Sequence, residues 1–148
     1  MSTTIIHDKE MRTQAIECLQ YANSYLLTFQ KSLVNKNTRF DNDMLYNLAS
    51  MSIEKYFVAL LARFDWNATH HMPISLYREA KELDPEIPVD MKQTAILVGK
   101  FEAICSLDGF GYRTPSTEDL KTMCNGLQEI RDWVEMRMEE IDYCLLDN

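Results

Sequence analysis

An arginine and two histidines follow one another closely at the end of a long apolar helical segment. Arg63 is separated by six residues from His70, and His71 comes next. Histidine can transfer a proton near neutral pH, and a guanidinium group can hold a phosphate through paired hydrogen bonds. A polar corner that carries these side chains after a helix could therefore form a site that moves a proton beside a bound anion.

Structural roles are the competing interpretation of the same residues. Arg63 would lie on the surface at a helix C-terminus, where the helix dipole favours a cation, and His70 would cap the next helix. Contact with a nucleotide phosphate is a third possibility. His71 could replace His70 if the corner bends differently. Trp66 is expected to cover the core, with base stacking as the alternative.

A second aromatic and cationic pair, Tyr112 and Arg113, lies in the loop predicted over residues 108–115. The pair could anchor the loop, or it could stack on a base and bind a phosphate. Metal chemistry has no comparable signal, because the chain contains no His-Glu-x-x-His, no Glu-x-x-His pair and no Cys/His spacing of a zinc site. No metal and no cofactor are therefore predicted.

Helices must position these side chains, and the spacing of apolar residues predicts about five of them. The chain has only four glycines and four prolines, too few breakers for a many-turned β fold. The second helix is apolar on two faces, so we expect it at the centre of the fold. We predict an all-α antiparallel bundle forming one domain over residues 1–148, with an ordered core at about 9–145 after a loose tail. The predicted helices span about residues 9–33, 42–64, 73–83, 89–107 and 117–143.

Gly99 and Gly126 fall inside two of these helices. Each should destabilise its helix by about 1 kcal/mol relative to alanine. Close approach of a neighbouring helix would explain such a glycine, and simple tolerance is the alternative.

Charge and cysteine content restrict the class of protein. A formal net charge of −8 argues against a broad DNA-binding surface, although a small nucleotide pocket remains compatible with it. The four cysteines show no Cys-x-x-Cys spacing and are expected to be free thiols, at least the first three of them buried, which suits a reducing cytoplasm. The N-terminus has no signal-peptide core, and no apolar run is long enough to cross a membrane, so we expect a cytoplasmic protein.

The segment at residues 48–61, Leu-Ala-Ser-Met-Ser-Ile-Glu-Lys-Tyr-Phe-Val-Ala-Leu-Leu, resembles the signature helix of HEPN domains. In that family an alanine, then Glu-Lys, then an apolar Ala-Leu-Leu ending recurs. The Thr-His-His at residues 69–71 resembles the Thr-His corner of the family. Tyr-Arg-Thr-Pro at residues 112–115 is similar to its Arg-Tyr-Pro segment with the order altered. The resemblance covers roughly residues 9–145.

This resemblance implies a helical bundle that commonly dimerises and acts in nucleotide- or RNA-related systems, often beside a nucleotidyltransferase. Some HEPN proteins are metal-independent ribonucleases that use an arginine, four to six residues and then a histidine, and Arg63 with His70 fits that spacing. However, Phe64 stands where these ribonucleases usually carry a polar residue, and Tyr77 comes late after the histidine. We therefore predict a non-catalytic, dimeric nucleotide- or RNA-associated module. A toxin-type ribonuclease and a purely structural scaffold are the alternatives.

Overall fold

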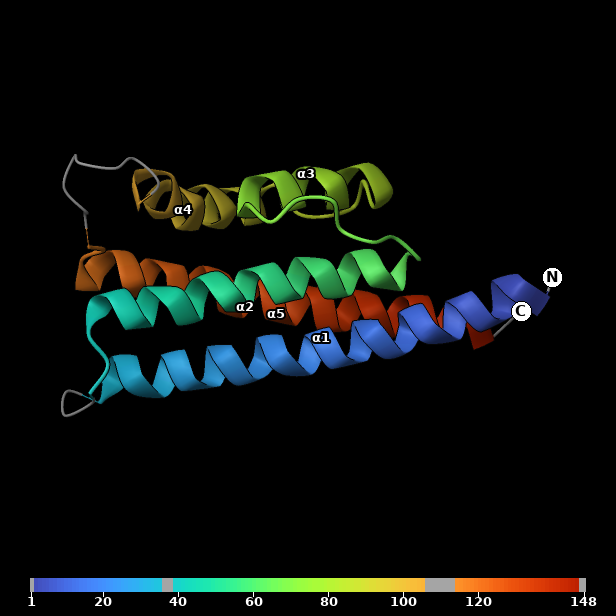
Figure 1. The fold of residues 1–148 in the computed structure, drawn as a ribbon, viewed down its shortest axis with the longest axis horizontal. Coiled ribbons are helices and arrows are strands. Elements are labelled where there is room, and N and C mark those ends of the chain that lie inside the picture. Colours follow the sequence, from blue (N-terminus) through green and yellow to red (C-terminus); the bar gives the residue numbers. More distant parts are fainter. Residues whose placement is uncertain (1, 36–38, 106–113, 147–148) are drawn as a thin grey trace.

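The computed structural model describes residues 2–35, 39–105 and 114–146, and these residues form five α-helices with no β-strand among them. Figure 1 shows α2 and α5 between α1 on one side and the α3–α4 pair on the other, with the start of α1 and the end of α5 at the same end of the bundle. The predicted all-α bundle is confirmed. The helices are α1 (Ser2–Val34), α2 (Asn42–Arg63), α3 (Pro73–Leu83), α4 (Asp90–Cys105) and α5 (Thr117–Leu146).

Local capping explains where several helices begin. The Asp41 carboxylate accepts a hydrogen bond from the Met44 amide at 2.8 Å, which stabilises the first turn of α2. At α5, Ser116 and Asp119 form a capping box, since each backbone amide donates to the side chain of the other at 3.0 Å. Pro73 occupies the first turn of α3, where its missing amide hydrogen costs nothing. These three starts agree with the sequence prediction.

The long outer helix α1 begins earlier than the sequence prediction. It starts at Ser2, whereas the apolar stripe predicted a start near Lys9 and a loose tail before it. No glycine or proline lies between these positions, so nothing in the local sequence stops the helix there.

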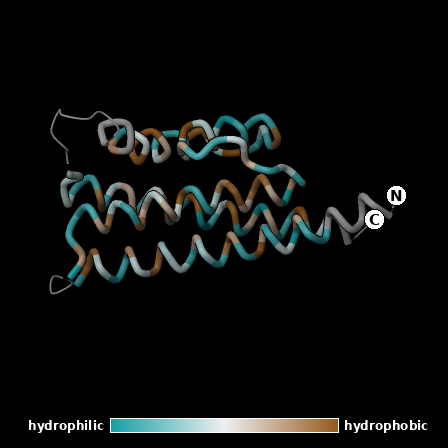
Figure 2. The backbone as a smooth tube through the Cα atoms, in the orientation of Figure 1, coloured by the Kyte–Doolittle hydropathy of each residue, from teal (hydrophilic) through white to brown (hydrophobic). Residues whose placement is uncertain are grey.

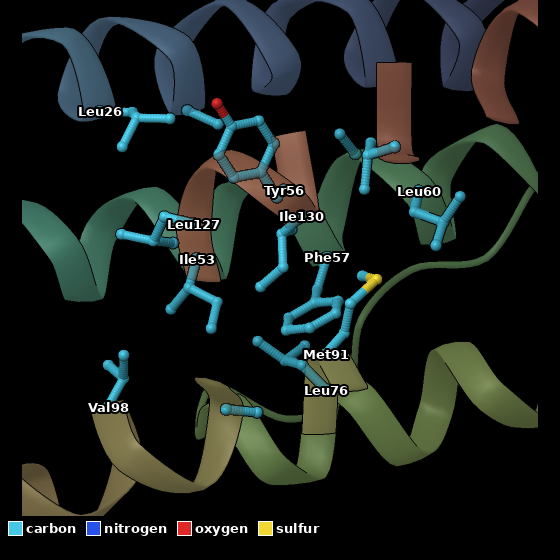
Figure 3. Close-up of a cluster of buried hydrophobic side chains, with 14 of the residues drawn as sticks. Leu26, Ile53, Tyr56, Phe57, Leu60, Leu76, Met91, Val98, Leu127 and Ile130 are labelled. Carbon is cyan, nitrogen blue, oxygen red and sulfur yellow. The ribbon is translucent and has the colours of Figure 1, made fainter. Parts of the chain in front are cut away.

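The core surrounds α2, as the apolar residues on two of its faces predicted. Ile53, Tyr56 and Phe57 have no exposed surface. Figure 3 shows apolar side chains from the other four helices converging on these residues, and hydrophobic positions alternate with hydrophilic ones along each helix in Figure 2. Within the part of the chain that the structure describes, no helix is apolar over a length sufficient to span a membrane.

The two helical glycines have different neighbours. A Cβ atom on Gly126 would overlap Thr94 Oγ1 and would lie 2.8 Å from Cγ2 and 3.0 Å from Cβ of the same residue. Gly126 therefore allows α5 to approach α4 closely. A Cβ atom on Gly99 would meet nothing nearer than Pro73 Cδ, at 3.9 Å. No close contact requires a glycine there, and the helix tolerates it.

Candidate functional site

Arg63, the last residue of α2, is buried in an ion pair, with only 6% of its side chain exposed. Its Nε donates to Asp142 Oδ1 at 2.7 Å, and Nη2 lies 2.7 Å from the same oxygen without making a hydrogen bond. Arg12 Nη2 approaches the other oxygen of Asp142 at 3.7 Å. These contacts connect the C-terminal end of α2 to α5 and α1. The expectation of a surface arginine is therefore wrong, because a carboxylate 79 residues away covers it.

This burial limits what the guanidinium can do. Breaking a buried ion pair by removing one partner typically costs about 3–5 kcal/mol, because the remaining charge is left uncompensated. A phosphate that engaged Arg63 would first have to displace Asp142, which already holds the guanidinium. The geometry indicates that Arg63 stabilises the helix ends.

The chain leaves α2 through a tight turn. Asp65 adopts a left-handed conformation with φ of 59°, and the Trp66 amide donates back to the Leu61 carbonyl at 2.9 Å. A left-handed residue after the last turn closes a helix by satisfying its final carbonyl groups. The turn leaves the Trp66 side chain 45% exposed. It is therefore accessible to a ligand.

Beyond the turn, Glu79 of α3 gathers the corner residues around its carboxylate. The Thr69 amide donates to Glu79 Oε1 at 3.1 Å, and the Thr69 hydroxyl and His70 Nδ1 make further hydrogen bonds to the same oxygen. Burial alone would raise the pKa of Glu79, but the hydrogen bonds from Thr69 and His70 outweigh it and lower the pKa. The carboxylate is thus ionised and nine-tenths buried, while 54% of the His70 side chain is exposed.

This arrangement defines the role that each histidine nitrogen can take. A carboxylate can only accept, so Nδ1 of His70 carries the hydrogen and Nε2 is the acceptor of the neutral ring. The alternative that His70 caps α3 is wrong, because Met72 is the N-cap residue and no side chain caps the helix. His71 lies apart: its Nδ1 is 3.3 Å from Glu54 Oε1 of α2, and its side chain is 89% exposed.

A pocket of about 280 Å³ lies against His70, between the corner and the polar face of α3. It brings together two of the predicted site residues, Trp66 and His70, but Arg63 does not line it. Tyr112 and Arg113 lie outside the residues that the structure describes. We call this space the corner pocket. Its lining residues are Trp66, Thr69, His70, Ser75, Arg78, Glu79 and Glu82.

The pocket contains four residues that the sequence analysis missed, Ser75, Arg78, Glu79 and Glu82, and the cation among them is Arg78. It is the pocket's arginine, and it lies on α3 rather than α2. A signal for it exists, since Ser75, Arg78, Glu79 and Glu82 recur at steps of three and four on the polar side of the helix. The spacing of an arginine before the histidine pointed to Arg63 instead.

Metal binding and cysteine chemistry are the two other kinds of site considered. Among the residues described, no group of three His, Cys, Asp or Glu side chains is placed to hold a metal ion. Cys18 and Cys124 are buried and free, and burial raises the pKa of both thiols, so neither is an activated nucleophile.

Comparison of the chain with models of protein families, with curated proteins and with solved structures found no match.

Proposed function

We propose that this protein is a HEPN-like, dimeric helical module that binds a nucleotide or an RNA end without cleaving it. It would act with a partner such as a nucleotidyltransferase. The observation that carries the proposal is the ion pair between Arg63 and Asp142. Because it buries the arginine of the predicted catalytic pair, the one cation that matches the ribonuclease spacing is not presented to a phosphate.

The corner pocket provides the binding surface in this proposal. The half-exposed Trp66 offers a face on which a base can stack, which is worth about 1–3 kcal/mol in single-stranded nucleic-acid sites. Arg78 and the exposed ring of His70 are the groups that can contact a phosphate. Glu82 can accept hydrogen bonds from ribose hydroxyls. One pocket of this size suits a single nucleotide better than a long duplex, in agreement with the net charge of −8.

The two arginines give the proposal a sharp test. Arg63→Met should lower the free energy of unfolding by several kcal/mol and leave nucleotide binding by the folded protein unchanged. Arg78→Ala should do the reverse, since its side chain is exposed. Lys100→Ala, which removes an exposed cation on α4, is the matched control for charge and should change neither property.

Binding can be measured through tryptophan fluorescence, to which Trp66 and Trp133 both contribute, and through thermal shifts with a panel of nucleoside mono-, di- and triphosphates and short RNAs. A ligand at 100 times its Kd stabilises the folded state by about 2.7 kcal/mol. Loss of this stabilisation in Trp66→Ala and Arg78→Ala would locate the ligand in the corner pocket. If no nucleotide or RNA stabilises the wild-type protein, the proposal fails and a structural scaffold is the better interpretation.

A ribonuclease remains the second candidate because of one observation, the orientation of His70 by Glu79. An exposed imidazole held by a buried carboxylate is suited to general acid–base catalysis. In that case Arg78, which lines the same pocket, would supply the cation. RNA cleavage in the presence of EDTA that disappears in both His70→Ala and Arg78→Ala would establish this function and overturn the binding proposal.

A further inference from the structure

One face of α1, beside the face that packs into the bundle, carries a stripe of uncharged side chains at helical spacing. Six residues follow one another at alternating steps of four and three from position 16 to position 34. That alternation is the heptad pattern through which two helices pack against each other in coiled coils. None of the six is charged, although 26% of the residues in the chain are. We call this stripe the α1 seam. It consists of Ile16, Gln20, Asn23, Leu27, Gln30 and Val34.

The α1 seam is distinct from the face of α1 that packs into the bundle. The core face carries residues such as Ala15, Ala22 and Phe29, which have no exposed surface. The apolar members of the seam are open to solvent instead: Ile16 is 43% exposed, Leu27 51% and Val34 82%. Figure 1 shows α1 at the edge of the molecule, and among the described helices it packs only against α2 and α5. The amide members are less open: Asn23 and Gln30 are half-buried, and Asn23 Oδ1 accepts a hydrogen bond from the Tyr56 hydroxyl of α2.

One edge of the α1 seam is lined by α5. Asn23, Leu27 and Gln30 of the seam share a groove of about 400 Å³ with Arg131, Asp132 and Glu135 of that helix. The opposite edge carries the exposed residues Glu17, Ser24 and Lys31, spaced seven apart. A helix that packs on the seam therefore meets α5 along one edge and the row of Glu17, Ser24 and Lys31 along the other.

The open edge indicates which occupant fits. Two α1 helices that pack antiparallel about a two-fold axis beside Ser24 place Glu17 opposite the partner's Lys31. The axis repeats that contact, so Lys31 also lies opposite the partner's Glu17, and both charges on each edge are paired. In a parallel arrangement the row of Glu17, Ser24 and Lys31 would instead face the partner's other edge, the one beside α5, and Glu17 would not meet Lys31. The charge row thus complements itself only when the second helix is another copy of α1 in the antiparallel direction.

The seam residues are also complementary in this register. Ile16 would lie against the partner's Val34, so the two most apolar contacts would close the ends of the interface. Leu27 would lie against the partner's Asn23, and Gln20 would lie opposite the partner's Gln30. Residues 16–34 span about 27 Å at 1.5 Å per residue. The polar layers weaken such a contact but fix its register, as single buried amides do in coiled coils.

We propose that the α1 seam is the surface through which two copies of this protein pair, in an antiparallel arrangement with the two-fold axis beside Ser24. This deepens the dimeric part of the proposed function and rests on it. The pairing leaves both corner pockets open, because they lie beyond α2, at the turn into α3.

Sedimentation equilibrium of the full chain between about 1 and 200 µM tests the proposal. Leu27→Glu places a carboxylate in the uncharged seam and should raise the dimer Kd by about tenfold or more, because that charge would have to be desolvated inside the interface. Ile96→Glu is the matched control. The exposed fraction of Ile96, 45%, is similar to the 51% of Leu27, but Ile96 lies on α4, in the other layer of the bundle. This substitution should leave the Kd unchanged.

Charge exchange on the open edge tests the register. Glu17→Lys alone should weaken the dimer, since it places a second lysine opposite the partner's Lys31. Glu17→Lys combined with Lys31→Glu should restore the dimer. A merely structural effect of the single substitution would not be rescued in this way. A wild-type protein that stays monomeric at 200 µM, or a dimer that Leu27→Glu leaves intact, would overturn the proposal. Nucleotide-induced thermal shifts are read separately, so a failed dimer and a failed corner pocket are distinguishable.

Discussion

Replacing Gly126 by alanine perturbs a close contact between α5 and Thr94 of α4, and Gly99→Ala provides a matched control within α4. Alanine is the better helix former by about 1 kcal/mol at either position. Only at Gly126 does the new methyl group meet a neighbour, since a Cβ there would overlap Thr94 Oγ1 and lie within 3.0 Å of two Thr94 carbons. The two substitutions should therefore change stability in opposite directions.

The contact distances set the size of the effect. Rotation of the Thr94 side chain can move Oγ1 and Cγ2 but does not relieve the contact with Cβ, which lies at 3.0 Å and moves only with the backbone. Overpacking of this kind typically costs about 1–3 kcal/mol, and the upper end applies when the backbone must shift. Subtracting the helix-propensity gain of about 1 kcal/mol leaves a net loss of about 2 kcal/mol for Gly126→Ala. Gly99→Ala should gain up to about 1 kcal/mol.

Urea denaturation followed by circular dichroism measures both values, and calorimetry should show a fall in Tm of about 4–8 °C for Gly126→Ala. A double-mutant cycle with Thr94→Ala adds a direct test, because that change removes Oγ1 and Cγ2 and should recover part of the loss. Equal stability of the Gly126→Ala and Gly99→Ala proteins, or no coupling between Gly126 and Thr94, would refute the close-crossing explanation.

Three further predictions follow from buried charges and thiols. Asp84→Ala should lower the free energy of unfolding by about 2–3 kcal/mol in urea titrations, because Asp84 is buried and accepts two hydrogen bonds from Arg137, which is itself part-exposed. The pKa of Glu79 is lowered in the folded state, so its stabilising contribution is present above the ordinary glutamate pKa of about 4.3 and is lost as the pH falls through the folded value. The stability difference between wild type and Glu79→Gln should thus be largest near pH 7 and shrink below about pH 4, and a constant difference would contradict this. In native protein, the exposed Cys144 should react rapidly with a thiol reagent and the buried Cys18 slowly, as peptide mapping by mass spectrometry can show.

Helix identity and several helix starts follow from local sequence. An acceptor side chain such as Asp41 or Ser116 bonds an amide three residues later, so the residues involved are neighbours in the chain. The apolar positions on two faces of residues 42–64 likewise required partners on two sides, and that segment is the central helix. The same local reasoning placed the start of α1 too late, because an apolar stripe reports burial and a helix can continue without it.

Tertiary structure alone decided what the polar residues do. Nothing near Arg63 in the sequence indicates that Asp142 will bury it, and nothing near Gly99 and Gly126 separates the tolerated glycine from the required one. Arg78 replaced Arg63 beside His70 for the same reason: the packing of α3 against α2 determines which cation lines the pocket. Periodicity and capping depend on residues a few positions apart, which the sequence displays. The partner of a charge or of a missing side chain depends on which distant helix packs there, and that is set by the fold as a whole.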